Sequence, residues 1–288
     1  MVLPCKHEQR MVRQVRPAIE LLTHLDQWHP DILRAHEINP ADYHEGLVFR
    51  SAVESIRGTF IAATMAGREA MVAEMLEAMV ERGQIVSYAY SGRRARYDFT
   101  VQLDATPEYF IALEVKGGEG NSLNISERPL WAREFVIWSH LDGAIVNAPA
   151  HGAHAVVNRL THALVRQRKQ VDLLLFRDAL CGTRARPCPK YAELRQDGLI
   201  APDFFLFPRR VPTPDDPHPP VHTLDTLRFP ARLLTALDVP REEWSRHLWS
   251  VDVELLTLPQ SRFRRRVRVW HEGELVDETL SRAWRSER

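Results

Sequence analysis

The chain has 288 residues with 38 basic and 38 acidic side chains, so its net charge is zero. This balance argues against a protein that coats nucleic acid indiscriminately. It does not exclude a DNA enzyme, whose basic residues can be clustered locally. Its hydrophobic fraction of 44% and charged fraction of 26% are those of an ordinary soluble protein, and no apolar stretch approaches the length of a membrane span. The three cysteines (Cys5, Cys181 and Cys188) do not make a disulfide framework, and the charged N-terminus is unlike a signal peptide, so we expect a cytoplasmic protein.

The first third of the chain predicts helices. Apolar residues recur at helical spacing across 11–36, where Pro17 and Pro30 divide the pattern into two short helices, and again across 45–64. A clear helix is predicted at 68–82, because six apolar residues mark one of its faces. Gly83 follows directly and is a typical residue at a helix C-terminus. The buried face of this helix is predicted to be Met71, Val72, Met75, Leu76, Met79 and Val80.

Three strands are predicted next, at 85–90, 96–103 and 109–116, because these runs are rich in β-branched and aromatic residues. Turn residues separate the strands at 91–94 and at 104–108. The three strands are therefore expected to form a meander in which the second and third pair as a hairpin.

A second group of elements follows a glycine-rich loop. The pattern predicts a helix at 130–140, a strand at 144–147, a helix at 153–167 and a buried strand at 171–176. The order of helix, meander, helix, strand, helix, strand indicates an α/β fold with a mixed central sheet flanked by helices.

The C-terminal third is expected to be rich in β structure. Six prolines between residues 208 and 220 predict an extended connector. Beyond it, a short helix is predicted at 230–237, a strand at 251–258, and a hairpin formed by 263–270 and 274–280.

We accordingly divide the chain into three parts. Residues 1–207 are predicted to hold the N-terminal helices and an α/β core, 208–222 the proline-rich connector, and 223–288 an extension for DNA reading or dimerisation.

The end of the third predicted strand carries the most informative residues. Glu114 and Lys116 lie two positions apart, so in a strand both point to the same face, and the hairpin brings Asp98 alongside them. The chain has 34 arginines and only four lysines, and lysine is a compact point charge that can lose its proton. Two carboxylates with carbonyl and water oxygens suit a hard cation such as magnesium, so these residues indicate metal-assisted phosphodiester hydrolysis.

At these residues the chain resembles the PD-(D/E)xK nuclease superfamily, which includes most type II restriction endonucleases. The resemblance implies that Asp98 and Glu114 bind the metal with the Val115 carbonyl, and that Lys116 positions the attacking water. Tyr97 stands where the motif has proline. The resemblance covers about residues 66 to 177 and implies a restriction-endonuclease-like core, with Mg²⁺ as the cofactor and Mn²⁺ as a substitute.

Many nucleases of this type carry a further metal-binding glutamate on the helix before the first strand. Glu69 is the candidate, because it continues the apolar face of the 68–82 helix, where a carboxylate needs a partner. Glu54 and Glu74 are alternatives, and a first-turn glutamate that favours the helix dipole is another explanation.

Several basic and polar residues are candidates for contacts with DNA. They lie in the turn before Asp98, in the loop after Lys116 and on the predicted strand near residue 265. These candidates are Arg93, Arg94, Arg96, Asn121, Ser122, Asn124, Arg128, Arg264, Arg266 and Arg268. Solvated turns and cross-strand pairing with Glu274, Asp277 and Glu278 are alternatives for the arginines.

No structural zinc is expected. Cys181 and Cys188 lack two further ligands at a recognised spacing, and His151, His154 and His162 have no carboxylate at metalloprotease spacing.

The predicted function is a magnesium-dependent, sequence-specific endonuclease for double-stranded DNA, of the type II restriction class. A homodimer is expected, because cutting both strands of a palindrome calls for two related sites. Open alternatives are a structure-specific or repair nuclease, an inactive DNA-binding protein with a nuclease-like fold, and a nucleotide-binding protein that uses the loop at Gly118.

Overall fold

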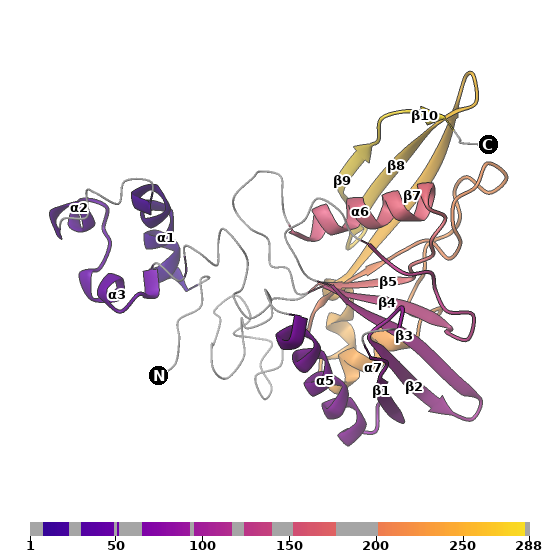
Figure 1. Ribbon diagram of the computed structural model, residues 1–288, viewed down its shortest axis with the longest axis horizontal. Helices are drawn as coiled ribbons and strands as arrows, with labels where there is room; N and C mark the ends of the chain where they lie inside the picture. The colour runs from indigo at the N-terminus through magenta and orange to yellow at the C-terminus, as the bar shows by residue number, and fades with distance from the viewer. Residues whose placement is uncertain are drawn as a thin grey trace.

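A mixed ten-stranded sheet forms the centre of the protein in the computed structural model (Figure 1). The structure describes residues 8–22, 30–48, 51, 65–92, 95–116, 124–139, 152–176 and 201–285. Nine strands follow one another in the sheet as β1-β2-β3-β4-β5-β6-β7-β8-β10, and β9 also pairs with β8. The predicted α/β class with a mixed sheet is thus confirmed.

The strands have the following bounds: β1 Ser87–Tyr90, β2 Phe99–Ala105, β3 Glu108–Lys116, β4 Glu134–Ser139, β5 Leu173–Phe176, β6 Asp203–Leu206, β7 Leu248–Leu258, β8 Arg262–His271, β9 Glu274–Leu280 and β10 Trp284–Arg285. β1, β2 and β3 form the predicted antiparallel meander, and β3, β4 and β5 are parallel. β6 runs antiparallel to β5 and parallel to β7, and the strands that follow β7 pair antiparallel.

Helices cover both faces of the sheet. On one face, α5 (Met65–Glu81) and α7 (Phe229–Ala236) pack against the sheet in one hydrophobic cluster, and on the other face α6 (Gly152–Arg166) packs in a second cluster. Alternate residues of β3 divide between these layers, because Leu113 and Val115 join the first cluster and Ala112 joins the second. The chain therefore has a helix–sheet–helix arrangement with two apolar layers.

The long helix before the meander ends as predicted. The Gln84 N–H donates to the Met79 carbonyl, and Gly83 takes a φ of 66°, a left-handed conformation that favours glycine. Four residues of the predicted face, Val72, Met75, Leu76 and Met79, are fully buried in the first cluster.

The predicted helix at 130–140 is wrong, because residues 134–139 form β4. Every residue of β4 is buried, since the strand lies between β3 and β5 with a helical layer over each face. A short apolar run that is buried on both faces has no periodicity that separates a strand from a helix. The predicted strand at 144–147 lies outside the described residues.

The N-terminal region differs from the prediction in its helix boundaries. α1 (Gln9–Leu22) continues through Pro17, because its apolar side packs with α2 (Pro30–Ala35) and α3 (Pro40–His44) in a cluster that includes Val15. Most of the predicted helix at 45–64 lies outside the described residues.

The C-terminal elements follow the prediction closely. α7, β7 and the β8–β9 hairpin lie at the expected positions, and the hairpin turns at Glu272 and Gly273, which both have positive φ. A 3₁₀ helix at Arg241–His247 and the short strands β6 and β10 were not predicted.

The proline-rich segment 208–222 connects β6 to the C-terminal elements. It contains an isolated bridge between Pro208 and Val221, and the Leu255 N–H of β7 donates to the Pro217 carbonyl. Because β6 also pairs with β7, one continuous sheet includes strands from both sides of this segment. The proposed division into three parts stays a prediction.

No helix in the described part of the chain is long and apolar enough to cross a membrane.

Candidate metal-binding and catalytic site

The ends of β2 and β3 bring together the three residues that carry the nuclease resemblance. Phe99, the first residue of β2, pairs with Leu113, so Asp98 lies next to Glu114 at the end of the ladder. Glu114 and Lys116 alternate with the buried Leu113 and Val115, and therefore lie on the face of the sheet that α6 covers. This point is also where the parallel strands β3 and β4 end side by side, because Lys116 pairs with Ser139.

Asp98 is fixed by two hydrogen bonds to β3. Its backbone N–H donates to the Leu113 carbonyl at 3.0 Å, and its side-chain Oδ2 accepts from the Val115 N–H at 2.6 Å. The carboxylate therefore continues the β2–β3 ladder by one step beyond the last strand pair, and it lies beside the peptide that links Glu114 to Lys116.

The Val115 carbonyl faces the same edge as the Asp98 carboxylate. Within an antiparallel ladder, one residue directs its N–H and its C=O toward the same neighbouring strand. Because the Val115 N–H points to Asp98, its carbonyl oxygen points to that side as well. The oxygens of these two residues are thus available at one place.

Glu114 is a buried carboxylate with two partners. Its Oε1 pairs with Lys116 Nζ at 2.5 Å, and its Oε2 accepts from the Ser126 N–H at 3.3 Å. The Glu114 side chain is 8% exposed and the Lys116 side chain 24% exposed, so the lysine is the more accessible member of this ion pair. Burial raises the pKa of Glu114, Lys116 and the Ser126 N–H oppose this rise, and the nearby charge of Asp98 adds to it.

The donor set at this site fits a hard divalent cation. Two carboxylates and a main-chain carbonyl are oxygen ligands of the type that magnesium prefers, with water in the remaining positions. Among the described residues, no three His, Cys, Asp or Glu side chains lie close enough to hold one ion. The candidate ligands among the described residues are therefore the two acids and the Val115 carbonyl.

Glu69 is not placed with these ligands. It is half-buried near the beginning of α5, and α5 packs on the face of the sheet opposite Glu114 and Lys116. The structure brings together Asp98 and Glu114 and leaves the role of Glu69 as a prediction. Glu54, its alternative, lies outside the described residues, and Glu74 is exposed on α5.

A pocket of about 530 Å³ borders the site. It is lined by Ala95, Arg96, Tyr97, Glu127, Arg128, Pro129 and Leu130. These residues directly precede Asp98 and directly follow Ser126, the residue whose N–H contacts Glu114. Arg96 is exposed at this pocket, whereas Arg128 donates to the buried Asp172 at 3.3 Å, so Arg128 has a structural contact as well. Asn124 is exposed on the same segment.

Two of the three β8 arginines predicted to contact DNA form ion pairs within the sheet. Arg266 contacts Glu254 at 3.1 Å and Arg268 contacts Asp252 at 2.7 Å. Both acids belong to β7, whereas the sequence suggested the acids of the following hairpin arm as the alternative partners. Arg264 is exposed. The pairing leaves Arg264 as the β8 candidate most accessible to DNA.

The remaining candidates lie partly outside the described residues. Arg93, Arg94, Asn121 and Ser122 belong to undescribed segments, as do Cys181, Cys188 and His151. His154 lies on α6, and its side chain is not described. His162 is exposed on α6, and burial together with the charges of Arg265 and Arg166 lowers its pKa.

Sequence reasoning missed two features of the site. The Ser126 backbone N–H gives no sequence signal, because every residue except proline provides one. The exposed side chains beside the bordering pocket, Leu130 and Trp131, were assigned to a helix that does not form. Trp131 packs edge-on against Tyr97, with ring centroids 5.2 Å apart, so the segment that returns to β4 contacts the residue before Asp98. Comparison with protein-family models, with curated proteins and with solved structures gave no match for this chain.

Proposed function

We propose that the protein is a magnesium-dependent, sequence-specific endonuclease for double-stranded DNA, of the type II restriction class. The observation that carries this proposal is the juxtaposition of Asp98, the Val115 peptide and the Glu114–Lys116 ion pair at the end of β3. The proposal includes a restriction-endonuclease-like core, for which the β2–β3 hairpin and the parallel β3–β4 pair provide support.

Asp98, Glu114 and the Val115 carbonyl would hold the ion. When bound, magnesium would polarise a phosphoryl oxygen and lower the pKa of a coordinated water. The protein keeps its own ligands in position without the ion, because the Val115 N–H holds the Asp98 carboxylate and Lys116 and Ser126 hold Glu114.

Lys116 is suited to orient the attacking water. Its side chain is paired with Glu114 and is more exposed than that carboxylate, so it would be accessible to a scissile phosphate. Water would attack phosphorus in line, the bond to the 3′ oxygen would break, and the products would be a 3′-hydroxyl and a 5′-phosphate. The positive charge of Lys116 also favours the negative charge that develops on the phosphoryl group.

The pocket beside the site would receive the DNA backbone next to the scissile bond. Arg96 is the described cation best placed for a phosphate there, because it is exposed and lies two residues before Asp98. A homodimer would place two such sites on the two strands of a palindromic sequence.

The deciding experiment incubates the protein with plasmid and phage DNA, with and without Mg²⁺. Discrete fragments that require Mg²⁺ support a restriction enzyme, and their loss in Lys116→Ala assigns the cleavage to this site. Manganese binding, followed by the electron paramagnetic resonance of free Mn²⁺, should be retained in Lys116→Ala and lost in Glu114→Gln.

Two alternatives give different results in the same assay. Cleavage confined to branched or damaged DNA would indicate a structure-specific or repair nuclease. Metal-independent DNA binding with no cleavage in Mg²⁺ or Mn²⁺ on any DNA form would indicate an inactive DNA-binding protein and would end the catalytic proposal.

A further inference from the structure

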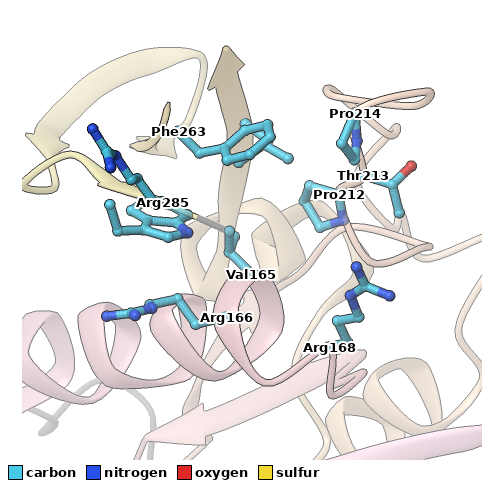
Figure 2. Close-up of a pocket in the computed structure, with 10 residues that line it drawn as sticks. Val165, Arg166, Arg168, Pro212, Thr213, Pro214, Phe263 and Arg285 are labelled. Carbon is cyan, nitrogen blue, oxygen red and sulfur yellow. The ribbon is translucent and has the colours of Figure 1, made fainter. Parts of the chain in front are cut away.

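A second pocket lies at the C-terminal end of α6, between this helix, the proline-rich segment and the beginning of β8 (Figure 2). Its volume is about 420 Å³, within the range of small-molecule sites. Figure 2 shows Val165 below Phe263, with Pro212 and Thr213 to the right and Arg168 extending toward Pro212.

This pocket is separate from the candidate catalytic site. α6 follows β4, whose last residue pairs with Lys116, and leads back to the beginning of β5. A helix of 15 residues spans roughly 22 Å. The pocket at the end of α6 therefore lies at the opposite end of the parallel strands from Glu114, and a ligand there would not touch the catalytic residues.

The pocket has an excess of positive charge. Arg166, Arg168 and Arg285 line it, and none of the other described residues of the lining carries a carboxylate. Within the described ranges, none of these three arginines forms an ion pair with an acid. Asp216, which belongs to the adjoining segment, pairs with Arg210 at 2.9 Å instead. One arginine in the last turn of α6 would be explained by the helix dipole, but three around one pocket favour an anion.

A fourth arginine reinforces this charge from within the protein. Arg265 is 8% exposed and lies directly opposite Leu255, a residue of the pocket wall, on the same face of the sheet. Its buried Nε has no hydrogen-bond partner in the part of the chain that the structure describes. Burying a guanidinium N–H without a partner is costly, and a nearby anion would reduce the cost of burying this charge.

Aromatic and apolar groups form the rest of the wall. Phe263 and Trp284 pair across β8 and β10 with their ring centroids 6.5 Å apart and tilted by 38°. The guanidinium of Arg166 lies 5.7 Å from the centre of the Trp284 ring. Aromatic faces beside arginines are the groups that proteins use to stack bases and to hold the attached phosphates.

We propose that this pocket binds a nucleotide unit, with its phosphate held by Arg166, Arg168 and Arg285 and its base against Phe263 and Trp284. The ligand is either a free nucleotide or an unpaired nucleotide at the end of a nucleic-acid strand, since both present the same groups. The proposal stands independently of the nuclease activity, because it uses none of the catalytic residues.

The test is isothermal titration calorimetry on the full chain in EDTA, which prevents metal-dependent cleavage. The probes are dAMP, adenosine, inorganic phosphate and a 5′-phosphorylated oligothymidylate. We expect dAMP or the oligonucleotide to bind at least tenfold more tightly than adenosine or phosphate. Binding of dAMP identifies a free nucleotide as the ligand, and binding of the oligonucleotide alone identifies a strand end.

Variants connect the binding to this pocket. Arg168→Ala and Arg285→Ala remove exposed cations, so both should fold, and each should weaken binding about tenfold or more. Phe263→Ala should lose the preference for dAMP over phosphate. Arg210→Ala, which removes an arginine that is already paired outside the lining, serves as the matched control and should bind normally.

Two results would overturn the proposal. The first is equal affinity for inorganic phosphate and both nucleotide probes, which would show an anion site without base recognition. The second is unchanged binding of the best probe in the Arg168→Ala/Arg285→Ala double variant, with circular dichroism confirming that the variant is folded.

Discussion

The Asp98 carboxylate accepts a 2.6 Å hydrogen bond from the backbone N–H of Val115, the residue between Glu114 and Lys116. One of its oxygens is therefore used for positioning, and this main-chain contact holds the carboxylate at the edge of β3. This division allows the charge of Asp98 to be separated from its structural contact by substitution.

Asp98→Asn should preserve the fold and abolish metal binding. An asparagine oxygen still accepts from the Val115 N–H, so the melting temperature should change little, whereas the ligand charge is lost. We expect Mn²⁺ affinity and cleavage rate to fall at least about 100-fold. Calorimetric melting and Mn²⁺ titration give the two readouts, and normal metal affinity in a folded Asp98→Asn protein would remove Asp98 from the ligand set.

Lys116→Ala should affect cleavage far more than DNA binding. The role proposed for Lys116 is to orient the water and to stabilise the developing charge, so its removal should lower the single-turnover rate by about 10²–10⁴. Lys116→Arg keeps the charge but not the compact ammonium, and should recover little of the rate. Fluorescence anisotropy in Ca²⁺ measures DNA binding without cleavage; weakened binding that accounts for the whole loss of rate would contradict the role assigned to Lys116.

Arg96→Ala should reduce the salt dependence of DNA binding. Loss of one phosphate contact lowers the slope of log K against log salt concentration by about 0.9. Arg266→Ala is the matched control, because Arg266 is occupied by Glu254 on β7. Anisotropy titrations between low and moderate salt compare the two variants, and identical slopes would exclude Arg96 from the DNA interface.

Asp172 should determine the stability of the core at acidic pH. It is fully buried and accepts hydrogen bonds from the Phe135 N–H at 2.8 Å, from Gln170 at 2.9 Å and from His222 at 3.1 Å. Burial alone would raise the pKa of Asp172, but the His222 hydrogen bond and the charge of Arg128 outweigh it and hold the pKa below its ordinary value of 3.8.

The sign of the pH effect follows from this depressed pKa. Asp172 contributes its full stabilisation above pH 3.8, the ordinary value, and the contribution is lost as pH falls through the folded-state pKa. Asp172→Ala should lower the free energy of unfolding by about 3–5 kcal/mol at neutral pH. It should also remove the loss of stability that protonation of Asp172 causes at acidic pH. Asp216→Ala, at an exposed ion pair, should cost no more than about 1 kcal/mol. Urea denaturation across pH 2–7 measures the free energy of unfolding of both variants. Equal losses of stability in the two variants would contradict the role assigned to Asp172.

The site was predictable because its information is local. Asp98, Glu114 and Lys116 lie on two strands joined by a short turn, so alternation within a strand and pairing within a hairpin were enough to place them together. The same holds for the β8–β9 hairpin, whose Glu272–Gly273 turn permits the positive φ angles that such turns require.

The elements that were missed depend on distant partners. β4 is a strand because β3 and β5 flank it, and β6 is a strand because β5 and β7 do. Their apolar runs carry no period that reveals these neighbours. α1 likewise continues through Pro17 because of packing with α2 and α3, which overrides the local preference.

The parallel pairing of β6 with β7 has a consequence for attempts to shorten the protein. A fragment ending at residue 207 would keep β5 but lack β7, so the backbone amides and carbonyls on one edge of β6 would be open to other chains. It would also uncover Phe205 and Phe207, which pack in one cluster with Val251, Val253 and Val267. Such a fragment should aggregate on expression, so experiments on a shortened protein that keeps the candidate site need to retain β7 and β8.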